Sequence, residues 1–292
     1  MQDNCNLVLH SLKRSLSVDR DKITIPNVHG KALIFPGNPP QRNSDRGEVQ
    51  ELIEVGFDPS YIRCLEEKED IADNLSDYYI DDVFILFEKA IDFLNKTRST
   101  FSYVHLDFCQ HLKENEIETI DSLQGKMDSI SRIRTSVSTN RGKSKQIDKE
   151  HIIRTKIMIP FVEMCFDSFN LDWDLIRSKL NESNRSSHII GFIYLINHYF
   201  DMSLEDMINW IDTCKSNQES KLPPHNGQFN LSNLTQFTYH QNGTTMETIW
   251  VDLNPYNYSS ISSDDLIYLD LYKYFYSLVS PIKVFAFLPK KG

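Results

Sequence analysis

The sequence contains no run of about 18 consecutive apolar residues, so it predicts no membrane-spanning helix. Its beginning, MQDNCNLVLHSLKRSL, lacks the long apolar core and the small-residue cleavage site of a secretory signal peptide. The same stretch has the pattern of a short amphipathic helix, within an N-terminal helical segment over residues 1–30. These absences predict a soluble, cytoplasmic protein.

The chain is also poor in cysteine. Its five cysteines, Cys5, Cys64, Cys109, Cys165 and Cys214, are odd in number and form no C-x-x-C pair. A disulfide framework and a zinc site are therefore not expected, and reduced thiols are the simpler interpretation.

Glycine is scarce as well, with 10 residues in 292. The sequence has neither a Walker phosphate loop nor a G-x-G-x-x-G dinucleotide motif, which weighs against most other nucleotide-binding α/β enzymes. The net charge is −10, so nucleic acid could bind only through a local basic patch.

Short apolar runs alternate with helical patterns over residues 31–147. The candidate strands are Lys31–Phe35, Tyr61–Leu65, Val83–Phe87, Phe101–Phe108 and Ile130–Val137. Strands that alternate with helices favour a mostly parallel sheet with helices on both faces. These residues therefore predict an α/β core, in which a ligand binds at the carboxyl ends of the strands.

The remaining residues follow other patterns. Residues 148–222 show helical periodicity and no clear strand, which predicts a helical insertion in which Pro160 starts or kinks a helix. Residues 223–292 contain Asn242-Gly243 between the β-prone runs Gln236–His240 and Met246–Leu253, a pattern typical of an antiparallel hairpin. We expect that hairpin at one edge of the sheet, and Lys283–Leu288 as a candidate last strand.

This order of elements resembles the class I, Rossmann-like S-adenosylmethionine-dependent methyltransferases, in which five parallel strands precede an antiparallel pair. The resemblance covers residues 31–137 and 234–253. It implies that Pro36 and Gly37, after the first strand, form the loop that passes under the methionine part of the cofactor, with Glu48 as the acidic residue of the next helix. The usual G-x-G-x-G is absent from this loop.

The resemblance also implies roles for acidic residues at three further strand ends. Glu66 would accept hydrogen bonds from the ribose hydroxyls of S-adenosylmethionine, with Glu67 as the fallback, because a carboxylate offers only acceptors. Glu88 would lie near the adenine. Asp107, in the sequence Leu-Asp-Phe-Cys-Gln, would lie beside the methyl group and act as the catalytic residue.

Two neighbours of Asp107 have simpler interpretations. His105 is expected to be a buried, hydrogen-bonded histidine rather than a base. Cys109 lacks the Pro-Cys context of cytosine-C5 methyltransferases and is expected to be a packed thiol.

A basic run extends from Lys126 to Lys156. It contains nine basic and three acidic residues, hence a net charge of +6 in an acidic chain. The run predicts either a solvated loop or a nucleic-acid contact, for which Arg141, Lys143 and Lys145 are the candidate residues.

Two classes of function remain open. The first is an S-adenosylmethionine-dependent methyltransferase acting on DNA or RNA. The second is a binding or structural module that keeps the fold without catalysis. The missing glycines support the second class, and so does Gln110 in place of a glycine after Cys109.

Overall fold

The computed structural model describes residues 25, 27–36, 47–79, 83–108, 110–139, 149–167, 173–182, 185–219, 221–224, 229–241, 244–255, 264–280 and 283–286. Most of the expected N-terminal helical segment lies outside these residues, as do Gly37, Cys109 and the Asn242-Gly243 turn.

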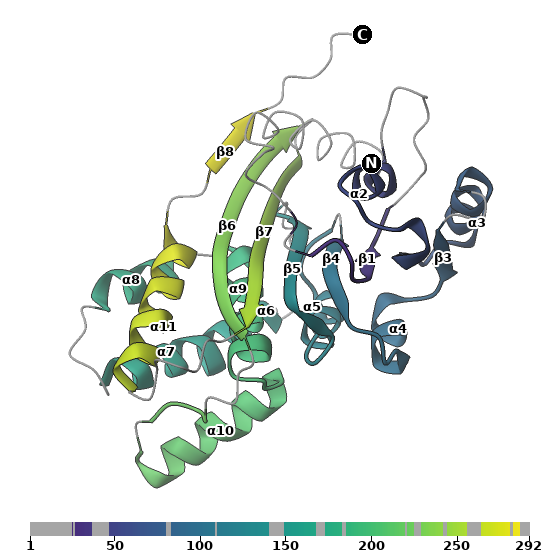
Figure 1. The fold of residues 1–292 in the computed structure, drawn as a ribbon. Helices are drawn as coiled ribbons and strands as arrows, with labels where there is room; N and C mark the ends of the chain where they lie inside the picture. The colour runs from purple at the N-terminus through teal and green to yellow at the C-terminus, as the bar shows by residue number, and fades with distance from the viewer. Residues whose placement is uncertain are drawn as a thin grey trace.

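One eight-stranded sheet runs through the molecule (Figure 1). Its strands are β1 (Ala32–Ile34), β2 (Ile62–Glu66), β3 (Phe84–Phe87), β4 (Phe101–Asp107), β5 (Met127–Ser138), β6 (Phe229–Gln241), β7 (Thr244–Pro255) and β8 (Lys283–Ala286). They lie in the order β3-β2-β1-β4-β5-β7-β6-β8. Neighbours among β1–β5 are parallel, and β7 is antiparallel to both β5 and β6. The expected fold class, a mostly parallel sheet completed by an antiparallel pair, is confirmed.

The far edge of the sheet differs from the prediction. The candidate last strand does form, as β8, and it pairs in parallel with β6. The hairpin of β6 and β7 is therefore an inner part of the sheet, and β8 is the edge strand. β-prone runs predict a strand, but they do not predict which neighbour it will pair with, because pairing depends on contacts far apart in the sequence.

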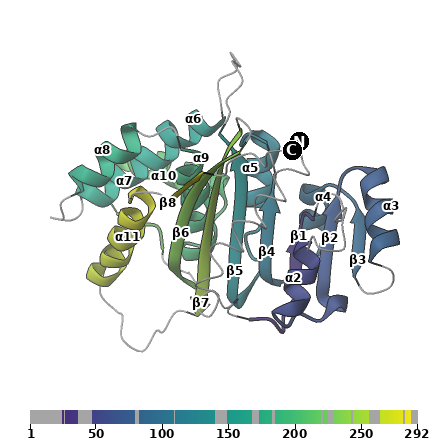
Figure 2. The same cartoon turned by 90° about the horizontal axis from the view of Figure 1, so that it is seen from above.

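Helices cover both faces of this sheet. They are α2 (Glu48–Glu54), α3 (Glu69–Tyr78), α4 (Ala90–Lys96), α5 (Glu114–Asp121), α6 (Lys149–Ile153), α7 (Ile159–Asp167), α8 (Asp174–Glu182), α9 (Ser186–Tyr194), α10 (Leu204–Asn217) and α11 (Asp264–Val279). Figure 2 shows α2 on one face, with α6–α10 on the other. In the described part of the chain, no helix is long and apolar enough to cross a bilayer.

The described residues between 149 and 219 contain helices joined by short connections and no strand, as the sequence predicted. Pro160 is the second residue of α7, which directly follows the π-helical turn Arg154–Met158. Proline has no backbone N–H to donate into the α-helical ladder, and such interruptions commonly accompany a local change of helix type. The expected start or kink at Pro160 is confirmed.

The two faces of each strand enter different cores, because successive side chains in a strand point to opposite faces. Ala32, Ile34 and Cys64 lie under α2 with Tyr103. Their neighbours in sequence, such as Leu33, belong to the larger core on the face covered by α4–α11. We call these the α2 face and the helical face.

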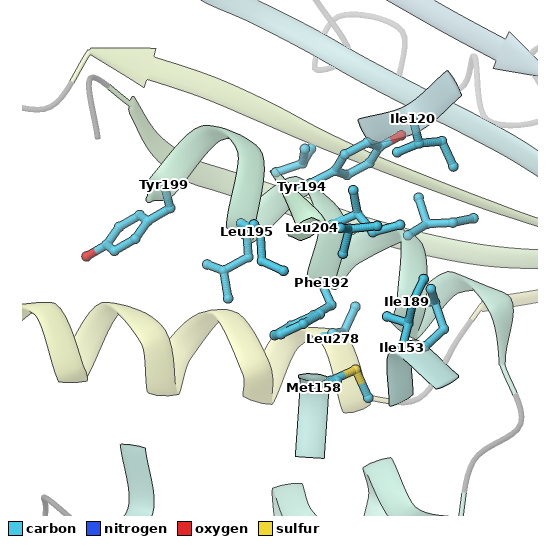
Figure 3. Packing of buried hydrophobic residues seen from close by; sticks show 14 of the residues in the cluster. Ile120, Ile153, Met158, Ile189, Phe192, Tyr194, Leu195, Tyr199, Leu204 and Leu278 are labelled. Atoms are coloured by element: carbon cyan, nitrogen blue, oxygen red, sulfur yellow. The ribbon is translucent and has the colours of Figure 1, made fainter. Parts of the chain in front are cut away.

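The larger core joins the sheet to the helical insertion. Figure 3 shows Ile189, Phe192 and Tyr194 of α9 packed together with Ile153 of α6 and Leu278 of α11. The packing is close at Gly191, where an added Cβ atom would stand 2.5 Å from the Cδ1 atom of Leu278. A side chain at this position would therefore require the side chain of Leu278 to move.

Candidate active site at the carboxyl ends of the strands

The candidate site lies where the strand order reverses. β1 has β2 on one side and β4 on the other, although β2 follows β1 and β4 follows β3 in the chain. The chain therefore continues from β1 to β2 and β3 on one side, and then crosses from β3 to β4 on the other side. In open parallel sheets a crevice forms at such a point.

The register places two carboxylates beside the end of β1. Ile34 of β1 pairs with Cys64 of β2 and with His105 of β4. Two residues further on, Glu66 and Asp107 end their strands at the same level and on the same face, with Pro36 between them. Adjacent strands are about 4.8 Å apart, so the two backbones are separated by about 10 Å.

Glu66 is buried while its neighbour Glu67 is exposed. An oxygen of the Glu66 carboxylate, Oε1, accepts a hydrogen bond of 3.0 Å from the backbone N–H of Lys68. Burial raises the pKa of the Glu66 carboxyl above its usual value, partly offset by hydrogen bonds from the backbone of Lys68 and Glu67. Of the two predicted candidates, Glu66 has the position suited to a ligand at the strand ends.

Asp107 is the last residue of β4 and is 8% exposed. The next residue, Phe108, donates its backbone N–H to the carbonyl of Ser136 on β5 and contacts the ring of Phe35 edge-on at 5.8 Å. These contacts of Phe108 join the ends of β1, β4 and β5 beside Asp107.

Glu88 follows the end of β3. Its backbone N–H donates to the carbonyl of Glu66, and its carboxylate forms an ion pair of 2.5 Å with Lys96 of α4. Glu88 is thus bonded to Glu66 at the carboxyl ends of β2 and β3. Its assignment to the adenine remains a prediction.

Glu48 forms hydrogen bonds that the sequence did not predict. The residue opens α2 and is buried, and its Oε1 lies 2.6 Å from Nδ1 of His105 and 3.2 Å from the hydroxyl of Tyr103, both on β4. This carboxylate therefore ties the start of α2 to β4. Its predicted contact with the cofactor would be additional to these bonds.

His105 is buried and hydrogen-bonded, which confirms the expectation for it. Burial lowers the pKa of His105 and favours the neutral ring, with an opposing contribution from Glu48. A carboxylate can only accept, so Nδ1 carries the proton and Nε2 accepts from the hydroxyl of Ser136 at 3.3 Å. Ser136 in turn lies 2.8 Å from the hydroxyl of Thr248 on β7, which completes a buried chain from α2 to β7.

Most of the described basic residues of the run bond to other parts of the protein, although the composition of the run predicted an exposed basic surface. Arg132 forms a buried, two-pronged ion pair with Asp252, and Arg154 is buried with donation to backbone carbonyls. Lys149 binds carboxylates of α5, and Lys126 donates to the carbonyl of Thr97. Of the described basic residues of the run, Lys156 is exposed.

The three candidate nucleic-acid contacts, Arg141, Lys143 and Lys145, lie outside the described residues. The described part of the run thus contributes mainly to the fold. The predicted basic surface is reduced to these three residues, together with Lys156. A count of charges could not have shown this, because the partners come from distant parts of the chain.

Comparisons with known proteins give likeness at the level of the fold. No protein-family model and no curated protein sequence matches the chain. Among solved structures, the N-methyltransferase NodS from Bradyrhizobium japonicum is 6% identical, with 84% of this chain and 97% of that chain covered and a TM-score of 0.39. An rRNA methylase from Streptococcus thermophilus is 7% identical, with 79% and 90% covered and a TM-score of 0.35.

A third similar structure is the fibrillarin pre-rRNA processing protein of Methanococcus jannaschii, at 8% identity, with 78% and 69% covered and a TM-score of 0.35. These scores are too low to carry an argument, so the assignment of the fold rests on the strand order and directions. Five parallel strands in the order 3-2-1-4-5, followed by an antiparallel pair, give this chain the class I, Rossmann-like methyltransferase fold in a divergent form.

Proposed function

We propose that this chain binds S-adenosylmethionine and transfers its methyl group to a nucleic acid. One observation carries the proposal: the buried carboxylates Glu66 and Asp107 end the two strands that flank β1, at the same level of the sheet. On this proposal one carboxylate would accept hydrogen bonds from the ribose hydroxyls and the other would face the acceptor, on opposite sides of the end of β1.

The residues present fit such a cofactor. Glu66 is a buried acceptor with one oxygen held by the backbone of Lys68. S-adenosylmethionine supplies an electrophilic methyl group. The protein needs to hold the acceptor in line with that group and to exclude water, and Asp107 would orient the acceptor or take up its proton.

The replacement Glu66→Ala is expected to weaken binding of S-adenosylmethionine and of S-adenosylhomocysteine. A hydrogen bond to a charged group contributes about 1.5–3 kcal/mol, so the Kd should rise about tenfold or more. The raised pKa of Glu66 adds a pH dependence: protonation removes acceptors, so affinity should fall as the pH drops toward and through that pKa. Titration calorimetry at several pH values measures both effects.

Glu67→Ala is the matched control, because Glu67 is the adjacent carboxylate and is exposed. It should bind like the wild type. If the wild-type protein binds neither compound at millimolar concentration, the proposal is wrong, and the chain is a module that keeps the fold without the reaction.

The nucleic-acid acceptor is tested separately. Replacement of Arg141, Lys143 and Lys145 by alanine should weaken binding to DNA or RNA of any sequence and reduce its salt dependence. Each lost phosphate contact lowers the slope of log K against log salt by about 0.7–0.9. Fluorescence anisotropy at several salt concentrations measures this slope, with Lys156→Ala as a single-charge comparison. Unchanged binding in the triple variant would contradict a nucleic-acid acceptor held by this run.

A further inference from the structure

Arg134 is a buried arginine of the sheet whose bonding differs from that of its neighbour Arg132. It lies in the middle of β5, on the α2 face, and is 5% exposed. Its Nε atom is fully buried without a hydrogen-bond partner. Within the part of the chain that the structure describes, its guanidinium forms neither a hydrogen bond nor an ion pair.

Two of the neighbouring carboxylates, those of Asp252 and Glu48, are engaged with other groups. Two residues earlier on the same strand and face, Arg132 takes Asp252 through two hydrogen bonds of 2.6 and 2.9 Å. Glu48 is held by His105, the residue that pairs with Arg134 across the sheet. Of these two arginines on one face of one strand, Arg132 has an acidic partner, and Arg134 has none among the described residues.

The side chain of Arg134 extends over β7 toward the carboxyl end of β5. Its Cζ atom lies 5.8 Å from the ring centre of Trp250, the residue opposite it on β7. The same atom lies 5.8 Å from the ring of Phe237 on β6, which pairs with Thr248, two residues nearer the carboxyl end of β5. The guanidinium thus lies between two aromatic rings, on the α2 face beside the strand that ends at Asp107.

A guanidinium that is this buried and whose Nε–H has no acceptor is costly, because most of the charged side chain has left water and has gained only weak contacts in return. Cation–π contacts near the limit of about 6 Å offset little of that cost. Such a group is expected where a ligand supplies the missing acceptors. The planar fork of arginine matches the oxygens of a phosphate group, which can accept two of its hydrogen bonds.

We propose that Arg134 binds a phosphate group of the methyl acceptor. This rests on the proposed function in one respect, since a nucleic acid supplies phosphodiesters. The site would anchor the acceptor chain on the α2 face of β5, next to the strand whose end carries Asp107.

The test compares Arg134→Met with Arg132→Met. Without ligand, Arg134→Met should raise the melting temperature by a few degrees, because an apolar side chain of similar length replaces an unpaired buried charge. Arg132→Met should lower it, because Asp252 is left buried without its partner. Inorganic phosphate should stabilise the wild type and Arg132→Met, and it should leave Arg134→Met unchanged.

A second measurement identifies the source of the phosphate. Binding of a single-stranded oligonucleotide should weaken about tenfold or more in Arg134→Met, the loss expected for one charge-assisted hydrogen-bonded pair. Arg134→Gln provides the same comparison if the methionine variant does not fold. A lost phosphate response with unchanged oligonucleotide affinity would overturn the nucleic-acid source and leave a small phosphate ester.

The proposal is overturned if phosphate stabilises wild type and Arg134→Met equally, if it stabilises neither, or if Arg134→Met is destabilised as much as Arg132→Met. Failure of this test is distinct from failure of the proposed function, because calorimetry with S-adenosylmethionine does not involve Arg134. Cofactor binding without a phosphate response would reject this site alone.

Discussion

Replacement of Asp252 by alanine is expected to reduce the free energy of unfolding by about 3–5 kcal/mol. Asp252 and Arg132 are both buried, and Asn233 donates a further hydrogen bond of 3.0 Å to the same carboxylate. Removal of one member of a buried ion pair leaves an uncompensated charge, which accounts for the size of the loss. Chemical denaturation with circular dichroism measures it.

Two controls define this result. Asp174→Ala breaks an Asp–Arg pair of the same chemistry on the surface of α8, and it should cost less than about 1 kcal/mol. The double variant Arg132→Met, Asp252→Leu should recover most of the loss, since apolar pairs often replace buried ion pairs without cost. A single variant Asp252→Ala as stable as the wild type would mean that the pair contributes no net stability.

The second large effect concerns Asp107. If this residue orients the acceptor or takes up its proton, Asp107→Asn should lower the rate of methyl transfer by about 10²–10⁴-fold, the usual contribution of a positioned base. Cofactor affinity should change little, because the proposed ribose contact lies on β2. Incorporation of labelled methyl groups into nucleic acid, together with calorimetry, separates the two.

Asp128→Asn is the matched control for Asp107. Asp128 is also an aspartate of a β-strand, but it lies near the start of β5, at the opposite end of the parallel strands from Asp107. There it accepts a hydrogen bond from Thr100. Its replacement should leave transfer unchanged. Transfer by Asp107→Asn at the wild-type rate would remove Asp107 from the reaction.

The sequence was sufficient to predict the fold because its strands are short apolar runs that end at turns or acidic residues. Lys31–Phe35 and Phe101–Phe108 contain β1 and β4 within a residue or two of each end. The carboxyl ends of parallel strands meet at one sheet edge, so the positions of Glu66 and Asp107 followed from the strand assignments.

The buried polar contacts could not be predicted in the same way. The alternation in β5 shows that Arg132 and Arg134 share a face. It does not show that Arg132 meets Asp252, which is 120 positions away, while Arg134 meets no acid in the described residues. For the same reason the sequence did not predict the bond between Glu48 and His105, which are 57 positions apart, and it predicted only a cofactor contact for Glu48.

The core on the helical face has a consequence for how the molecule unfolds. It combines Leu33 and Val104 of the parallel strands with Ile189 of the insertion and Leu271 of α11 in one continuous cluster. Neither the first half nor the helical half can be removed without exposing the apolar surface of the other. Heating should therefore give one cooperative transition, with calorimetric and van't Hoff enthalpies that agree, and deletion of residues 148–222 should leave an aggregating chain rather than a smaller folded protein.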